Sequence, residues 1–220
     1  MTRQLTRVGL GLLIWSSGAL VAVLPPGLTL EKGKLGAQTR SQPALTRVLI
    51  ETELGEIEVE VDTGHAAITA GNFLKYVEGG YYDGGRFFRA VRMDNQPNDK
   101  VKIEVIQAGA NPETLKEKKP FPPIPLERTR DTGILHGDGA LSMARSAPDS
   151  ATHSFSICIG GQPALDYGGM RNPDGQGFAA FGRVVRGMDV ARKIQQQPAE
   201  GQTLKPSIKI IRVRMVPSSK

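Results

Sequence analysis

GGYYDGGRFFRAV, residues 79–91, is the stretch that decides how this chain folds. Two glycine pairs, which favour turns, bracket Tyr81 and Tyr82. A strand-like run follows and carries one cation, Arg89, between apolar neighbours. On this segment alone, Arg89 fits a half-exposed strand arginine that covers aromatic surface. A guanidinium fixed beside an apolar groove could instead hold a peptide carbonyl or perturb an amide bond, so the surrounding chain decides between the two.

The sequence around this stretch is dominated by short strand patterns. Ile57, Val59 and Val61 alternate with glutamates, which predicts a strand with one buried face, and residues 66–78 have helical spacing up to the first glycine pair. Further strands are predicted at residues 46–52, 86–93, 101–108, 140–145, 154–159, 178–185 and 206–216, and a second helix at 188–195. Residues 111–125, with five prolines, are expected to form a long surface connection. Many short strands with two helices predict a closed or nearly closed antiparallel barrel with helical caps.

The N-terminal segment predicts export. Arg3 and Arg7 precede an uncharged run at residues 8–24, the pattern of a signal peptide or of an uncleaved membrane anchor. We therefore expect a signal segment at 1–24, a flexible linker at 25–43 and one folded domain at 44–220. The net charge is +6, of which residues 1–40 hold +4, so the body has no basic stripe that would indicate nucleic-acid binding.

Reactive side chains are sparse. The single cysteine, Cys158, cannot form an internal disulfide and fits a buried thiol in an apolar strand. His65, His136 and His153 lack the spacing of metal ligands and are expected on the surface or in loops. Because no phosphate-binding or nucleophile motif is present either, the sequence predicts neither a metal nor a cofactor.

Seven segments, in order along residues 46–216, resemble the cyclophilin family of peptidyl-prolyl isomerases, especially its exported bacterial members. The segments are GEIEVEVD, AGNFLKYVEGGYYDG, RFFRAV, VIQAGANP, GALSMAR, APDSATHSFSICIG and FAAFGRVVRGMDVARKI. The resemblance implies a mainly β fold, in which a closed eight-stranded antiparallel barrel is capped by two α-helices.

The resemblance also implies a site. Arg89 matches the family's catalytic arginine and Gln107 its groove glutamine. The implied substrate-binding residues are Phe88, Val105, Ala144, Arg145, Ser154, Ser156, Leu165 and Phe178. Several positions depart from the family's pattern. Ser156 stands where the family usually has the aromatic floor of the proline pocket, and Ser154 stands where it usually has a second glutamine. Ala164 replaces a Trp or Phe, and Phe178 replaces a His or Tyr. Glu104, or Ile103 if the alignment shifts by one residue, stands where another Phe is usual.

The implied reaction is rotation about an X–Pro amide, whose resonance barrier is about 18–20 kcal/mol. It requires no nucleophile or metal, and Arg89 would stabilise the twisted amide more than the planar one. We expect a monomeric, exported folding enzyme that acts on proline-containing peptides or unfolded exported proteins outside the cytoplasm, with a possible membrane tether. The alternative is a non-catalytic proline-peptide-binding module on the same fold. A serine hydrolase is a third hypothesis, although neighbouring His153 and Ser154 would point to opposite faces of a strand.

Overall fold

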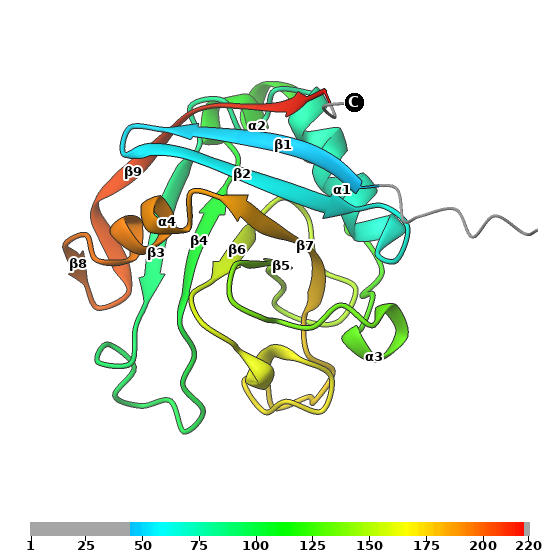
Figure 1. The fold of residues 1–220 in the computed structure, drawn as a ribbon, viewed down its shortest axis with the longest axis vertical. Helices are drawn as coiled ribbons and strands as arrows, with labels where there is room; N and C mark the ends of the chain where they lie inside the picture. Colours follow the sequence, from blue (N-terminus) through cyan, green and yellow to red (C-terminus); the bar gives the residue numbers. More distant parts are fainter. Residues whose placement is uncertain (1–44, 218–220) are drawn as a thin grey trace, which may run out of the picture. The chain divides into compact units, whose positions relative to one another are not determined.

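The computed structural model describes residues 45–217 (Figure 1). The predicted signal segment or anchor at 1–24 and the predicted linker at 25–43 lie outside the described residues. Within residues 45–217, no helix is both long and apolar enough to cross a membrane.

Eight strands close into an antiparallel barrel, as predicted. Around the ring the order is β1-β2-β7-β5-β6-β4-β3-β9, and β9 pairs with β1 to close it. The ring strands are β1 (Leu45–Thr52), β2 (Gly55–Asp62), β3 (Arg86–Val91), β4 (Val105–Gly109), β5 (Ala140–Met143), β6 (Phe155–Cys158), β7 (Ala179–Arg186) and β9 (Thr203–Val216). A two-residue strand, β8 (Ala199–Glu200), pairs with β9 outside the ring.

The alternation in β2 fixes its register against β1. Val59 lies opposite Val48 and Ile57 opposite Ile50, and all four side chains are fully buried. A shift by one residue would place the β2 glutamates in the core, so this register is strongly specified.

Two helices pack on different parts of the barrel, close to their predicted bounds. α1 (Ala67–Glu78) contacts β2, β7 and β9, whereas α4 (Met188–Gln195) contacts β2, β3 and β4, and Figure 1 shows them on opposite sides. Phe73 of α1 enters the core, with its ring centroid 5.2 Å from that of Phe155 and 5.3 Å from that of Phe181. Phe155 is fully buried, as its strand pattern predicted.

The segment at 111–125 is not a featureless connection. It contains α2 (Pro112–Lys118), whose N-cap Asn111 accepts a hydrogen bond from the backbone N–H of Glu113. An Asn cap followed by proline at the first helical position is a local start signal that outweighs the proline content. Two further short helical turns, α3 (Thr129–Thr132) and the 3₁₀ turn η1 (Pro163–Leu165), lie in later connections.

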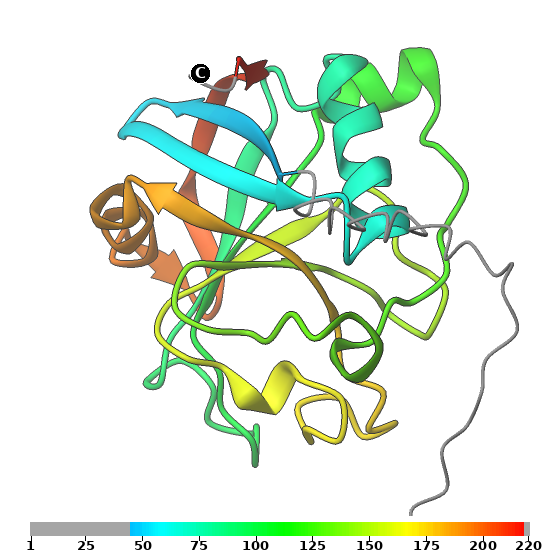
Figure 2. The ribbon, with the colours of Figure 1, turned by 45° about the vertical axis from the view of Figure 1, so that its right-hand side comes forward.

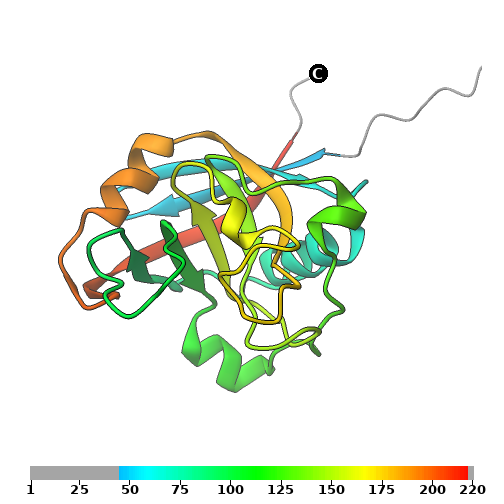
Figure 3. The same cartoon turned by 90° about the horizontal axis from the view of Figure 1, so that it is seen from below.

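Two long loops lie at the same end of the barrel, the β3–β4 loop (residues 92–104) and the η1–β7 loop (residues 166–178), as Figures 2 and 3 show. The strand predicted from residue 101 begins only at Val105. In the two residues before Val105, backbone groups bond to side chains and not to a neighbouring strand. Gln96 both donates to and accepts from the backbone of Ile103, and Gln162 accepts from the backbone N–H of Glu104.

Candidate functional site

A pocket of about 140 Å³ lies on the outer face of the barrel beside these two loops. Its lining residues are Arg89, Ile103, Val105, Gln107, Ser142, Ala144, Arg145, Ser156, Leu165, Arg171 and Phe178. They come from four adjacent strands, β3, β4, β6 and β5, and from the loops. Such a volume suits a small ring, since a cavity of about 150 Å³ holds one benzene molecule.

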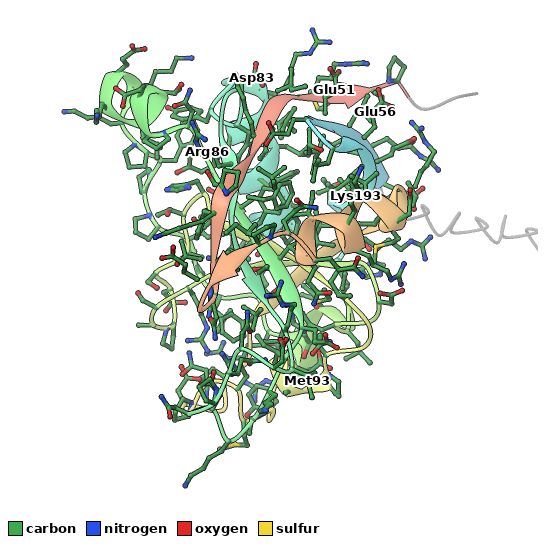
Figure 4. The ribbon with its side chains drawn as sticks, turned by 90° about the vertical axis from the view of Figure 1, so that its left-hand side faces the viewer. Glu51, Glu56, Asp83, Arg86, Met93 and Lys193 are labelled. Carbon is green, nitrogen blue, oxygen red and sulfur yellow. The ribbon has the colours of Figure 1, made fainter. Side chains whose placement is uncertain are left out.

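The sheet face of the pocket is a row of polar side chains in register. Arg89 lies opposite Gln107, Gln107 opposite Ser156, and Ser156 opposite Ser142. Directly paired residues point to the same face of a sheet, so the four side chains follow one another across the strands. Figure 4 shows β3, which carries the first of them, running from Arg86 toward the loop that holds Met93.

Arg89 is held by two neutral amides. Its Nη1 donates to Oε1 of Gln107 (3.0 Å), while Nε and Nη2 both donate to Oε1 of Gln202 (2.9 and 2.5 Å). Each terminal nitrogen carries a second N–H, for which residues 45–217 offer no partner. Burial lowers the pKa of the Arg89 guanidinium, and the charge of Arg171 lowers it further. An arginine still remains protonated at neutral pH, so the pocket receives a fixed cation with free donors.

The apolar walls of the pocket rest on a small core outside the barrel. Ile103, Val105 and Leu165 belong to this cluster, Phe178 packs against it, and Cys158 lies within it. Burial raises the pKa of the Cys158 thiol to about 12, and the carboxylates of Asp166 and Asp138 add to the shift. Cys158 is therefore a packing residue, as predicted, and not a nucleophile.

Arg145 fixes the η1–β7 loop beside the pocket. Its guanidinium pairs with both carboxylate oxygens of Asp174 (2.7 and 2.9 Å), donates to the backbone carbonyl of Gly177, and lies 4.9 Å above the ring of Phe178. The hydrogen bonds from Arg145 lower the pKa of the Asp174 carboxyl. Because the Arg145 side chain is fully buried, this clamp holds Phe178 in place as a wall of the pocket.

Arg171 joins the two loops. It extends from the η1–β7 loop and donates from Nη1 to Oε1 of Gln96 and to the backbone carbonyl of Val101 in the β3–β4 loop. The same nitrogen lies 3.0 Å from the Asp99 carboxylate. These contacts close one side of the pocket with a side chain that no sequence motif had indicated.

The structure brings eight of the ten sequence-predicted site residues to the pocket. The exceptions are Phe88 and Ser154, which lie beside Gly109, next to the polar row; a Cβ on Gly109 would come within 3.4 and 3.3 Å of them. Phe88 follows the buried Phe87 and points outward, where it is 37% exposed, and the bulge between Phe87 and Arg89 then puts Arg89 on the outer face opposite Gln107. A role for Phe88 and Ser154 in binding stays a prediction.

Of the two candidates at the end of the β3–β4 loop, Glu104 and Ile103, it is Ile103 that lies at the pocket. Ile103 lines the pocket, whereas the carboxylate of Glu104 turns away and accepts from Gln195. Ala164 packs against the apolar cluster behind the pocket.

His136 is buried, contrary to the expectation that it lies on the surface. Its Nδ1 is 2.7 Å from Asp166 Oδ1, and its Nε2 is 2.9 Å from the Oγ of Ser142. Within the predicted strand, Ser142 alternates with Ala144 and so shares its face, a signal that could have placed this serine in the site. Residues His136 and Asp166 lie in loops, where no periodicity could have paired them.

Comparisons with known proteins identify the family of this chain. The sequence model of the family described as "Cyclophilin type peptidyl-prolyl cis-trans isomerase/CLD" matches residues 47–215. The chain is 37% identical over 156 residues to peptidyl-prolyl cis-trans isomerase A of Dickeya dadantii, covering 70% of this chain and 74% of the relative. It is 34% identical over 189 residues to a peptidyl-prolyl cis-trans isomerase of Acinetobacter baylyi, covering 82% and 92%.

Solved structures show the same fold. A crystal structure of a Cryptosporidium parvum cyclophilin type peptidyl-prolyl cis-trans isomerase superposes with a TM-score of 0.60 at 18% identity, covering 80% of this chain and all of the other. A second structure of that protein, determined in the presence of the dipeptide Ala-Pro, superposes with a TM-score of 0.61 at 19% identity, covering 78% and 99%. From the extent of the family match and the identity to its relatives, this chain belongs to the cyclophilin type peptidyl-prolyl cis-trans isomerase family.

Proposed function

We propose that this protein catalyses cis–trans isomerisation of X–Pro peptide bonds and that Arg89 stabilises the twisted amide. The observation that carries the proposal is the position of Arg89 at the pocket, where Gln107 and Gln202 hold its guanidinium while two N–H groups have no partner among residues 45–217. Membership of the family and the names of the relatives support the same reaction class.

The chemistry follows from the amide itself. As the C–N bond twists, resonance is lost and the nitrogen gains a lone pair that can accept a hydrogen bond. A donor aimed at this nitrogen stabilises the twisted state more than the planar ground state, which lowers the barrier. The apolar walls formed by Val105, Leu165 and Phe178 would hold the proline ring still while the preceding residue turns.

The test is an exchange assay on proline peptides with the full chain and two arginine variants. Arg89→Ala is expected to lower kcat/KM at least about tenfold, the effect of one lost charge-assisted hydrogen bond in the transition state. Arg86→Ala is the matched control, because Arg86 is an exposed arginine at the start of the same strand and donates to Ser207. Equal rates for all three proteins, or none above the uncatalysed rate, would sink the proposal.

A non-catalytic peptide-binding module is the second candidate. Ser156, in the middle of the polar row, favours it, because the pocket has a small hydroxyl on its sheet face where an aromatic side chain would grip a ring more tightly. A titration with the same peptides separates the two candidates: saturable binding without accelerated exchange would identify a binding module.

For cellular location we propose export, with the protein acting as a monomer that assists folding of exported proteins outside the cytoplasm. The support is the sequence of residues 1–24, where Arg3 and Arg7 precede an uncharged run. Cell fractionation tests the location, and protein found only in the cytosolic fraction would refute it. Sedimentation tests the oligomeric state, and a stable dimer at micromolar concentration would refute the monomer.

A further inference from the structure

The sheet face of the pocket holds a hydroxyl group with no protein partner. Ser156 is only 9% exposed and lines the pocket, yet its Oγ makes no hydrogen bond to any of residues 45–217. Among residues 45–217 the only fully buried side-chain polar atom without a partner is Thr69 Oγ1, so the Oγ of Ser156 is accessible from the pocket. The Ser156 hydroxyl is therefore available to bond a polar group that enters the pocket.

The neighbouring hydroxyl, that of Ser142, has a defined direction. Oδ1 of Asp166 accepts from the backbone N–H of His136 (3.1 Å) and lies 2.7 Å from Nδ1 of the same residue. That oxygen accepts, so Nδ1 carries the proton; in the neutral imidazole Nε2 is then an acceptor. With the imidazole in this neutral form, Ser142 donates its O–H to Nε2 over 2.9 Å, which leaves the lone pairs of its Oγ for the pocket.

The two serines thus offer one donor and one acceptor side by side. They are directly paired across β5 and β6, so their Cβ atoms are about 4.5–5.5 Å apart and both oxygens can reach a single atom placed between them. A hydroxyl group is the simplest partner that both donates and accepts: its proton goes to Ser142, and its oxygen accepts from Ser156.

We propose that this pocket selects prolyl rings that carry a hydroxyl group, as in 4-hydroxyproline, over unsubstituted proline; this rests on the proposed isomerase function. The apolar walls, including Val105 and Leu165, contact the ring carbons, while Ser142 and Ser156 bind the ring hydroxyl at the sheet face. His136 and Asp166 act as positioning residues, because they fix which way the Ser142 hydroxyl points.

The test compares three matched tetrapeptides with the full chain. They differ only at one ring, which is proline, trans-4-hydroxyproline or cis-4-hydroxyproline, and each rate is corrected for its own uncatalysed exchange. We expect kcat/KM for one hydroxylated epimer to exceed that for proline by about threefold to tenfold, the effect of one or two net hydrogen bonds.

Three serine variants locate the effect. Ser156→Ala and Ser142→Ala should each lower the hydroxyproline-to-proline ratio by about threefold or more, whereas Ser207→Ala on β9 should leave it unchanged. The ratio is taken within one protein sample, so partial unfolding of a variant cancels.

A higher kcat/KM for the proline peptide than for both hydroxyproline peptides would overturn the inference. The same hydroxyproline-to-proline ratio in Ser156→Ala as in the wild type would also overturn it, and would mean that the Ser156 hydroxyl bonds only to solvent. If no peptide is exchanged, the proposed isomerase function fails instead. Calorimetric titration of the same three peptides then still decides the preference for the hydroxyl group, because equal affinities would refute it.

Discussion

Gln202 provides the sharpest test of how Arg89 is positioned. Its Oε1 accepts two of the three side-chain hydrogen bonds made by Arg89, and its own amide nitrogen donates to the carbonyl of Asn95 in the β3–β4 loop. In Gln202→Ala only the bond to Gln107 holds the guanidinium. Hydrogen bonds to a charged group are worth about 1.5–3 kcal/mol, and water can replace one of the two at this half-exposed position. A loss of about 1.5 kcal/mol corresponds to about a tenfold fall in kcat/KM.

A double-mutant cycle separates positioning from general damage. The exchange assay would be run on wild type, Gln202→Ala, Arg89→Ala and the double variant, with Gln196→Ala, an exposed glutamine at the end of α4, as the control. If Gln202 acts through Arg89, its removal should cost about tenfold in the wild-type background and almost nothing once Arg89 is absent. Equal losses in both backgrounds would refute the reasoning, as would a Gln202→Ala variant with wild-type kcat/KM.

Three further predictions concern ionisable side chains whose pKa is shifted in the folded protein. Hydrogen bonding to Arg145 lowers the pKa of Asp174, so the stabilisation from this clamp is complete above the ordinary carboxyl pKa and is lost as the pH falls through the lower folded value. The melting temperature should therefore drop below about pH 4, and Asp174→Asn should flatten that slope; an unaltered slope would count against the clamp. Burial lowers the pKa of His153, so the folded state resists its protonation, and the free energy of unfolding should decline as the pH falls below about 6.5. His153→Gln should remove this part of the decline between pH 7 and 5. A stability curve identical to that of the wild type would contradict the prediction. Because the Cys158 pKa is about 12, a thiol reagent at pH 8 should label the native protein negligibly and the denatured protein fully, and rapid native labelling would show that the thiol is accessible.

Local sequence signals accounted for most of the fold. The alternation of Ile57, Val59 and Val61 specified both a strand and its buried face, and the register against β1 follows from it. The same kind of signal failed at residues 101–104, where apolar residues suggested strand. There the side chains of Gln96 and Gln162 occupy the backbone groups that a strand would need, and no window of sequence shows that.

The residues of the site also fall into two groups, those on strands, which the sequence pattern located, and those in loops, which it did not. Arg89, Gln107 and Ser156 lie on strands, and the order of motifs placed Arg89 and Gln107 in one groove by resemblance. Only the folded chain shows the bulge between Phe87 and Arg89 that puts Arg89 on the same face as Gln107. His136 was misplaced because its burial depends on Asp166, which lies 30 residues away in a loop. Loop residues follow no periodic pattern, so their partners become visible only in the folded chain.

By itself, the sequence determined the barrel, its two principal helices and a cation among aromatic residues at 79–91, because alternation, helical spacing and glycine turns act over a few residues. Only the tertiary structure decided what surrounds that cation. Arg89 meets Gln202, 113 residues later, when β3 pairs with β9, and Arg171 meets Gln96 only when two loops converge. These bonds exist because closing the barrel brings distant segments together, and it is that closure that turns a strand arginine into part of a pocket.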